Sequence, residues 1–109
     1  MENRPVPLAV LISGRGSNLR AIAEAIAAGG IDARIAVVIS NRADAAGLEF
    51  ARGLGLRALV MPHRDYPSRD DYDRALVDEL RRHGVQLVCL AGFMRLLGPR
   101  FCGAFPNAV

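Results

Sequence analysis

The residues best suited to chemistry form a short glycine-rich segment near the start of the chain, GRGSN at 14–18. Gly14 and Gly16 let the backbone turn sharply and approach a ligand closely. A helix that begins at this turn directs free N–H groups and the positive end of its dipole to one point, which attracts an anion, most often a phosphate. Ser17 and Asn18 would add side-chain donors, although either would serve equally as the helix N-cap. Because Gly-x-Gly alone is a weak signal, both interpretations stay open.

A second candidate segment, GFMRLL at 92–97, follows an apolar run late in the chain. Arg95 lies among apolar neighbours, where a guanidinium can bind a carboxylate or a phosphate through two parallel hydrogen bonds. Met94, Leu96 and Leu97 are suited to line a flat apolar pocket for a ring system, but such residues belong more often to a core. The segment therefore predicts either an apolar binding pocket with one cation or a core segment beside a surface arginine.

Arg69 and two histidines are the remaining candidates. Arg69 stands where a helix is expected to begin, and a cation there opposes the helix dipole, so it has either a binding role or a solvated side chain. His63 could act as an acid or a base, but no partner for it is identifiable, and His83 suits the end of the same helix. The nearby acidic residues are interpreted as helix-start charges: Asp65, Asp70, Asp71 and Asp73. No spacing of Cys, His or Asp indicates a metal site.

Apolar runs must form the strands that position these candidates. The expected strands cover residues 8–13, 35–40, 57–61 and 86–91. Apolar strands that alternate with amphipathic helices form βαβ units, which build a parallel sheet with right-handed crossovers. The sequence therefore predicts an α/β, Rossmann-like fold, a parallel sheet with helices on both faces.

Three amphipathic segments are expected to be helical. The first covers residues 17–28, and the second begins near Asp44 as its N-cap and stops at Gly55. The third follows Ser68, whose spacing to Asp71 is that of a capping box. In this third helix one face is apolar and consists of Tyr72, Leu76 and Leu80.

A parallel sheet of this kind binds its ligand beyond the carboxyl ends of the strands. Four loops are expected at that edge, at 14–18, 41–44, 62–69 and 92–97. The polar candidates for binding all fall in these loops. Their convergence is a stronger indication of a small-molecule site than any single residue.

Composition narrows the class of protein. The chain has 109 residues, enough for one domain, and about half of them are apolar. The formal net charge of +3 comes from scattered arginines, so nucleic acid is not an expected partner. No apolar run approaches the length of a membrane span, and no signal peptide is recognisable. Cys89 and Cys102 suit buried free thiols in a reducing cytoplasm.

The last residues predict a fold that continues. Gly98-Pro99 suits the start of another helix, and Ala108-Val109 suits the opening of another strand. Four strands would leave apolar surface and a bare sheet edge, through which copies of the chain could associate. We therefore expect this chain to be the first part of a longer fold.

Three segments together carry a resemblance to a known family: LISGRGSNL at 11–19, SNRADAAGL at 40–48 and LAGFMRLL at 90–97. In order and separation they resemble the N-terminal half of the phosphoribosylglycinamide formyltransferases, from about Leu8 onward. The resemblance implies transfer of a formyl group from 10-formyltetrahydrofolate to the amine of glycinamide ribonucleotide, in de novo purine biosynthesis in the cytoplasm. It implies no metal.

The resemblance also implies roles for particular residues. Gly16, Ser17 and Asn18 would hold the phosphate of the ribonucleotide. The folate pocket would be lined by Arg69, Met94, Arg95, Leu96 and Leu97.

The family's catalytic residues have no counterpart in this sequence. The family's Asn-x-His-Pro segment would begin just after Val109, with a catalytic Asp further on, and neither His63 nor His83 matches the catalytic histidine. Residues 1–109 are therefore expected to form a single phosphate-binding N-terminal half that binds substrates without catalysis.

Three alternatives belong to other classes. Formyltetrahydrofolate deformylases use the same folate but lack the glycine-rich phosphate turn. A dinucleotide-binding domain requires a third glycine where Leu19 stands and an acidic residue where the second strand ends in Ser40-Asn41-Arg42. Neither requirement for NAD is met, and Arg42 alone leaves NADP open. A non-catalytic, nucleotide-binding Rossmann-like fragment also fits this chain.

Overall fold

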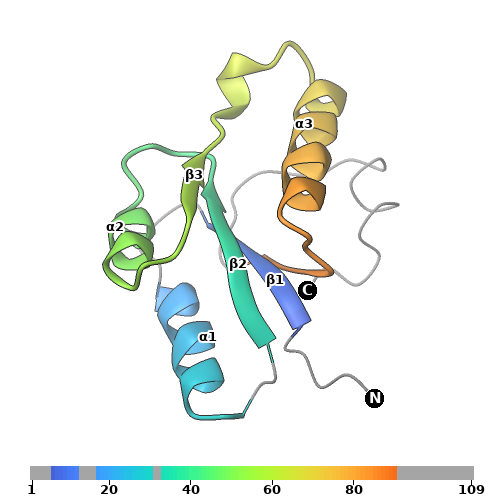
Figure 1. The fold of residues 1–109 in the computed structure, drawn as a ribbon. Coiled ribbons are helices and arrows are strands. Elements are labelled where there is room, and N and C mark those ends of the chain that lie inside the picture. The colour runs from blue at the N-terminus through green and yellow to red at the C-terminus, as the bar shows by residue number, and fades with distance from the viewer. Residues whose placement is uncertain (1–5, 13–16, 31–32, 91–109) are drawn as a thin grey trace.

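A computed structural model describes residues 6–12, 17–30 and 33–90, without the side chains of Ser17, Asn18 and His63. These residues form one parallel sheet of four strands in the order β3-β2-β1-β4 (Figure 1). The strands are β1 (Val6–Ile12), β2 (Ala33–Ser40), β3 (Ala58–Val60) and β4 (Leu87–Leu90). The helices are α1 (Ser17–Ala27), α2 (Ala46–Gly53) and α3 (Arg69–Arg82), with a 3-10 turn η1 (His63–Asp65) between β3 and α3. The expected α/β fold is confirmed.

The central strand β1 is buried on both faces, which explains its unbroken apolar sequence. Alternate residues point to opposite sides of the sheet. Leu8, Val10 and Ile12 pack in a cluster with α1 and α2, and each is at most 2% exposed. Ala9 and Leu11 pack in the other cluster, with α3. Figure 1 shows the same arrangement, with α1 and α2 on one side of the sheet and α3 on the other.

Strand β2 contains an irregularity that the sequence did not predict. Its pairing with β1 passes from Leu8↔Ile35 to Ala9↔Val37, so Ala36 is an extra residue. Ala36 and Val37 both pack in the cluster on the α3 side, although neighbouring residues of a regular strand face opposite sides. Beyond the bulge, neighbouring side chains again face opposite sides of the sheet: Val38 packs on the side of α1 and α2, and Ile39 packs on the side of α3.

Helix α2 begins later than expected, and the predicted N-cap is wrong. The N-cap is Ala45, which has no capping side chain, and the helix ends at Gly53. The Asp44 carboxylate is bound to Arg42 instead and is not available to the helix. The chain then turns at Gly55, whose φ of 76° is in the left-handed region that glycine tolerates.

Helix α3 begins as the sequence predicts. The Ser68 hydroxyl accepts a hydrogen bond from the backbone N–H of Asp71 at 3.1 Å and donates one to the Asp71 carboxylate at 3.0 Å. The predicted apolar face is also confirmed, since Tyr72, Leu76 and Leu80 are all fully buried. Asp73 differs from the expected solvated helix-start charge, because it is only 1% exposed.

Candidate functional site

The edge formed by the carboxyl ends of the strands contains the point where the chain changes direction across the sheet. From β1 the chain passes through α1 to β2 and then to β3, whereas α3 returns it to β4 on the other side of β1. The pairing Leu11↔Leu90 places the carboxyl ends of β1 and β4 next to each other. In open α/β sheets, ligands bind in the crevice at such a switch point.

Both predicted binding segments leave the sheet at this switch point. The glycine-rich turn joins the end of β1 at Ile12 to the start of α1 at Ser17, and the segment at 92–97 follows β4. Ser17 and Asn18 are the first two residues of α1, as the sequence predicts. The other predicted site residues here lie outside the described residues: Gly16, Met94, Arg95, Leu96 and Leu97. The ligand contacts of both segments remain predictions.

Arg69 and His63 lie on the connection between β3 and α3, whereas His83 lies at the other end of α3. Arg69 is the exposed first residue of α3, so it lies near the carboxyl edge, as expected. His63 belongs to η1 on the same connection. His83 is the C-cap of α3 at the opposite edge, where its Nδ1 lies 2.9 Å from the carbonyl oxygen of Glu79. This confirms the structural interpretation of His83.

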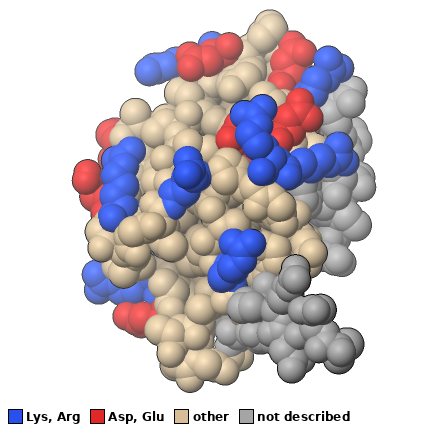
Figure 2. All heavy atoms as spheres, in the orientation of Figure 1, with Lys and Arg blue, Asp and Glu red and all other residues tan. Residues whose placement is uncertain are grey.

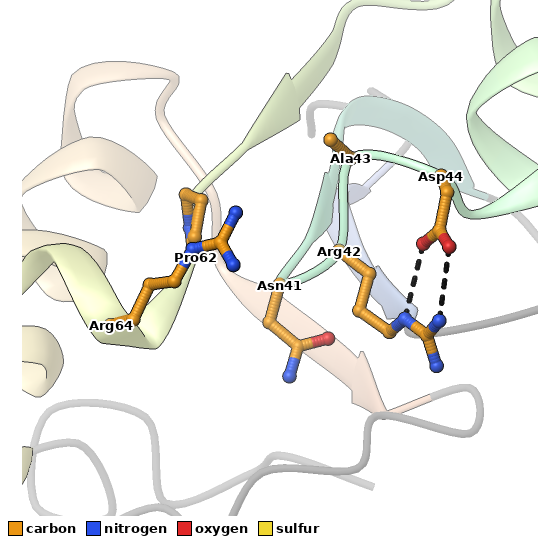
Figure 3. Close-up of a pocket in the computed structure, with 6 residues that line it drawn as sticks. All are labelled: Asn41, Arg42, Ala43, Asp44, Pro62 and Arg64. Carbon is orange, nitrogen blue, oxygen red and sulfur yellow. Dashed lines mark hydrogen bonds and ion pairs between the residues drawn. The ribbon is translucent and has the colours of Figure 1, made fainter.

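A pocket of about 460 Å³ opens at the carboxyl ends of β2 and β3. Its lining comes from the two loops that follow these strands: Asn41, Arg42, Ala43, Asp44, Pro62 and Arg64. The Met61 N–H donates to the Ser40 carbonyl oxygen at 2.8 Å, which holds the two loops together. In Figure 3, Asn41 lies between Arg64 on one side and the Arg42–Asp44 pair on the other.

Hydrogen bonds of Ser40 shape the first of these loops. The Ser40 hydroxyl, fully buried, accepts from the Arg42 N–H at 3.0 Å and donates to the Arg42 carbonyl oxygen at 2.8 Å. This small turn keeps Asn41 only 7% exposed and sends the Arg42 side chain outward. A buried hydroxyl therefore helps to fix the conformation of this loop.

Arg42 and Asp44 form a two-pronged ion pair. Arg42 Nε donates to Asp44 Oδ1 at 3.1 Å and Nη2 donates to Oδ2 at 3.0 Å. These hydrogen bonds lower the pKa of the Asp44 carboxyl and raise the pKa of the Arg42 guanidinium, and the attraction between the charges acts in the same direction. This loop was expected at the ligand edge, but none of its residues was predicted to bind the ribonucleotide or the folate, and Arg42 was considered only for NADP. The Arg-x-Asp spacing was the available signal.

Other chemical groups add little to this edge. In the described segments, no group of three or more His, Cys, Asp or Glu could hold a metal ion. Burial raises the pKa of the Cys89 thiol on β4.

Figure 2 shows arginines scattered among acidic and uncharged residues over the visible face. Within the part of the chain that the structure covers, no helix has the length and apolar character to cross a membrane.

Comparison with known proteins agrees with this geometry. Residues 6–109 match the family model described as formyl transferase. The chain is 45% identical over 94 residues to phosphoribosylglycinamide formyltransferase of Escherichia coli strain K12, a match that covers 86% of this chain and 44% of that protein. It is 49% identical over 96 residues to the trifunctional purine biosynthetic protein adenosine-3 of Drosophila pseudoobscura pseudoobscura, covering 86% of this chain and 7% of that protein.

Solved structures show the same likeness. The crystal structure of glycinamide ribonucleotide transformylase 1 from Symbiobacterium toebii superposes with a TM-score of 0.93 at 49% identity, over 99% of this chain and 51% of that one. The chain thus spans about half the length of the single-function relatives that it matches. The match with the family model extends through β1, the switch point and the segment after β4, and the chain therefore belongs to the formyl transferase family.

Proposed function

We propose that the protein to which this chain belongs transfers the formyl group of 10-formyltetrahydrofolate to the amine of glycinamide ribonucleotide. Its support is that the relatives from Escherichia coli, Haemophilus influenzae and Arabidopsis thaliana are named phosphoribosylglycinamide formyltransferase, and that the relative from Drosophila pseudoobscura pseudoobscura is named for purine biosynthesis. We also propose the cytoplasm as its location.

One observation carries the proposal. The pairing of Leu11 with Leu90 puts the ends of β1 and β4 side by side, and in the sequence the two predicted binding segments follow these two ends. A reaction between a phosphorylated amine and a folate needs both substrates at one place, and proximity can supply a large part of the rate enhancement. Adjacent strand ends provide that arrangement.

The phosphate of the ribonucleotide is assigned to the turn between β1 and α1. Gly16 would allow close approach of the backbone, and Ser17 and Asn18 would donate hydrogen bonds at the start of α1. The first turn of that helix contains no acidic residue, so no carboxylate of that turn would repel the phosphate.

The folate is assigned to the other side of the switch point. Met94, Arg95, Leu96 and Leu97 would line the pocket, with their backbone groups at the ring system, and the Arg69 guanidinium would contact the folate, where it can pair with a carboxylate. Arg69 suits this role because it is exposed and precedes two acidic residues, Asp70 and Asp71, that satisfy the start of α3 without it.

The catalytic acid and base are not assigned to these residues. In formyl transfer the neutral amine attacks the formyl carbon, and the resulting oxyanion requires hydrogen-bond donors. We propose that this chain forms the binding half of the site and that the proton-transfer residues come from the part of the protein corresponding to the unmatched half of its relatives.

The full-length protein tests the proposal directly. It is incubated with 10-formyltetrahydrofolate and glycinamide ribonucleotide, and both the formylated ribonucleotide and free formate are quantified. We expect formylated ribonucleotide in amounts equal to the folate consumed. Release of formate without formylated ribonucleotide would identify a hydrolase of the formyl folate and contradict the proposal.

A further inference from the structure

The entry into α3 contains an aromatic contact to which the proposed function gives no role. The rings of Tyr66 and Tyr72 meet edge to face, with their centroids 5.2 Å apart and their planes at 89°. Tyr72 of α3 is fully buried, and Tyr66 is partly buried against the same apolar cluster. Edge-to-face contact is a favoured geometry of aromatic pairs at such distances. The contact therefore joins the loop before α3 to the helix itself.

The two rings lie on either side of the helix start. Because Ser68 is the N-cap of α3, Tyr66 stands two residues before the cap and Tyr72 four residues after it. In a hydrophobic staple, the residue directly before the cap packs on the fourth helical residue and fixes the angle at which the chain enters the helix. Here the residue directly before the cap is Pro67, and the tyrosine one position earlier makes the contact. Pro67 has a fixed φ and holds the residue before it in an extended conformation, which restricts the entry further.

Arg69, which is assigned above to the folate, lies inside the segment that this contact closes. It is the first residue of α3 and follows the cap directly. Two hydrogen bonds close the same turn: the Asp71 N–H donates to the Ser68 hydroxyl and the Tyr72 N–H donates to the Ser68 carbonyl oxygen, both at 3.1 Å. The ends of helices open locally at small cost in free energy. A ring contact across the turn opposes that opening.

The Arg69 side chain has no ionic partner to hold it in place. Across residues 6–12, 17–30 and 33–90, no ion pair engages its guanidinium. Arg74 and Arg82 of the same helix each have a carboxylate partner. The helix dipole also disfavours a cation at this end of α3. The placement of Arg69 therefore depends on its backbone, and so on whatever keeps the first turn closed.

We propose that Tyr66 is a positioning residue for the folate. Through its contact with Tyr72, it keeps the first turn of α3 in the form that presents Arg69 at the carboxyl edge. This inference deepens the proposed function and rests on it for the identity of the ligand. Tyr66 itself is assigned no contact with the folate, so its effect on binding passes through Arg69.

The first test measures kcat and the KM for both substrates with the full-length protein. Tyr66→Ala should raise the KM for 10-formyltetrahydrofolate about two- to tenfold, the factor that an aromatic pair contributes. The kcat and the KM for the ribonucleotide should not change, because the lost interaction is equal in the ground state and the transition state. Tyr66→Phe keeps the ring and should keep the KM for the folate. An unchanged KM in Tyr66→Ala, or a raised one in Tyr66→Phe, would overturn the inference.

Phe50→Ala is the matched control. Phe50 is also a partly buried aromatic residue, but it belongs to α2 on the other side of the sheet. Its ring contacts a neighbouring helix, with the guanidinium carbon of Arg20 5.1 Å from the ring centroid. The variant loses an aromatic contact of its own and should keep the KM for the folate. A similar rise in this KM in both alanine variants would indicate a general loss of stability and overturn the inference.

A double variant tests whether the effect passes through Arg69. Arg69→Gln alone should raise the KM for the folate, because it removes the contacting charge. If Tyr66 acts only by presenting Arg69, Tyr66→Ala added to Arg69→Gln should raise the KM no further. A KM in the double variant that multiplies the effects of the two single substitutions would overturn the inference.

Amide hydrogen exchange separates this inference from the proposed function, because it needs no folate. The amides of Asp71 and Tyr72, both bonded to Ser68, should exchange about two- to tenfold faster in Tyr66→Ala and at the unaltered rate in Phe50→Ala. Unchanged exchange in Tyr66→Ala would overturn the inference even if formyl transfer is intact. Faster exchange in a protein that forms no formylated ribonucleotide would support the role of Tyr66 at the helix start and refute the proposed function.

Discussion

Ser17 and Asn18 give the most direct residue-level prediction, because they begin α1 immediately after the turn assigned to phosphate. Replacing both by Ala removes two donors to a charged group, and each such hydrogen bond contributes about 1.5–3 kcal/mol. We expect the KM for glycinamide ribonucleotide to rise at least about tenfold, with a much smaller change for the folate. Steady-state kinetics on the full-length protein measure both.

A loss of stability at the start of α1 must be distinguished from loss of a phosphate contact in this double variant. Ser68→Ala removes a serine cap from α3 without touching the phosphate turn and is the appropriate control. If both proteins lose similar thermal stability but only the double variant changes its KM, the effect is on binding. An unchanged KM in the double variant would contradict the phosphate assignment.

The Arg42–Asp44 pair predicts a dependence of stability on acid pH. The guanidinium lowers the pKa of the Asp44 carboxyl below its ordinary value of 3.8, so the unfolded chain binds more protons in acid than the folded chain. The contribution is fully present above that ordinary value and is lost as pH falls through the folded pKa. Asp44→Asn should therefore be slightly less stable at neutral pH and equal to the unaltered protein in strong acid.

Chemical denaturation at several pH values measures this difference. Both side chains are largely exposed, 61% for Arg42 and 71% for Asp44, so the effect should be small and should shrink in high salt. Arg42→Gln should reproduce the same pH profile, because it removes the other partner. A stability difference that grows toward acid would contradict the pairing.

At the scale of elements, Ser68 determines where α3 begins. Ser68→Ala removes the acceptor for the Asp71 N–H and should lower the free energy of unfolding by about 1 kcal/mol. Ser68→Asp keeps a capping oxygen and should retain most of the stability. Thermal melts followed by circular dichroism compare the three proteins, and equal melting temperatures would show that the cap contributes nothing.

The elements differ in how far the sequence could define them. The apolar runs of β1 and β2 and the capping residue of α3 are local signals, and the strands and helix predicted from them are confirmed. The start of α2 was mispredicted because Asp44, a good N-cap by type, has a stronger partner in Arg42. The bulge at Ala36 depends on the register between two strands, which one strand's sequence does not contain.

The candidate site could likewise be predicted only in part from the sequence. The loops that carry the binding residues could be placed at one edge because parallel strands all end there. The pocket between two of these loops could not be predicted, because the loops become neighbours through the pairing of β2 with β3, which neither loop's sequence contains. The burial of Asp73 could not be predicted either, because the sequence indicates its position in the helix but not the neighbours that cover it.

At the scale of the molecule, the residues that stabilise the fold and the residues predicted to bind ligands lie on different parts of the sheet. Both apolar clusters lie on its faces, whereas the candidate site and the pocket lie along its carboxyl edge. Substitutions along that edge should therefore change binding more than folding. The opposite edge, where His83 caps α3, serves the fold.

The outer edge of β4 gives a prediction for the whole polypeptide. In the described residues, β4 pairs only with β1, and Leu90 at its end is 41% exposed. An unpaired strand edge beside exposed apolar side chains is a site for pairing with another chain. We expect residues 1–109, expressed alone, to associate as their concentration rises. Leu90→Lys should weaken this association, whereas Leu54→Lys, at a leucine beyond α2 that is 50% exposed, should not. Sedimentation velocity at several concentrations distinguishes the three proteins, and a monomer throughout would refute association through β4.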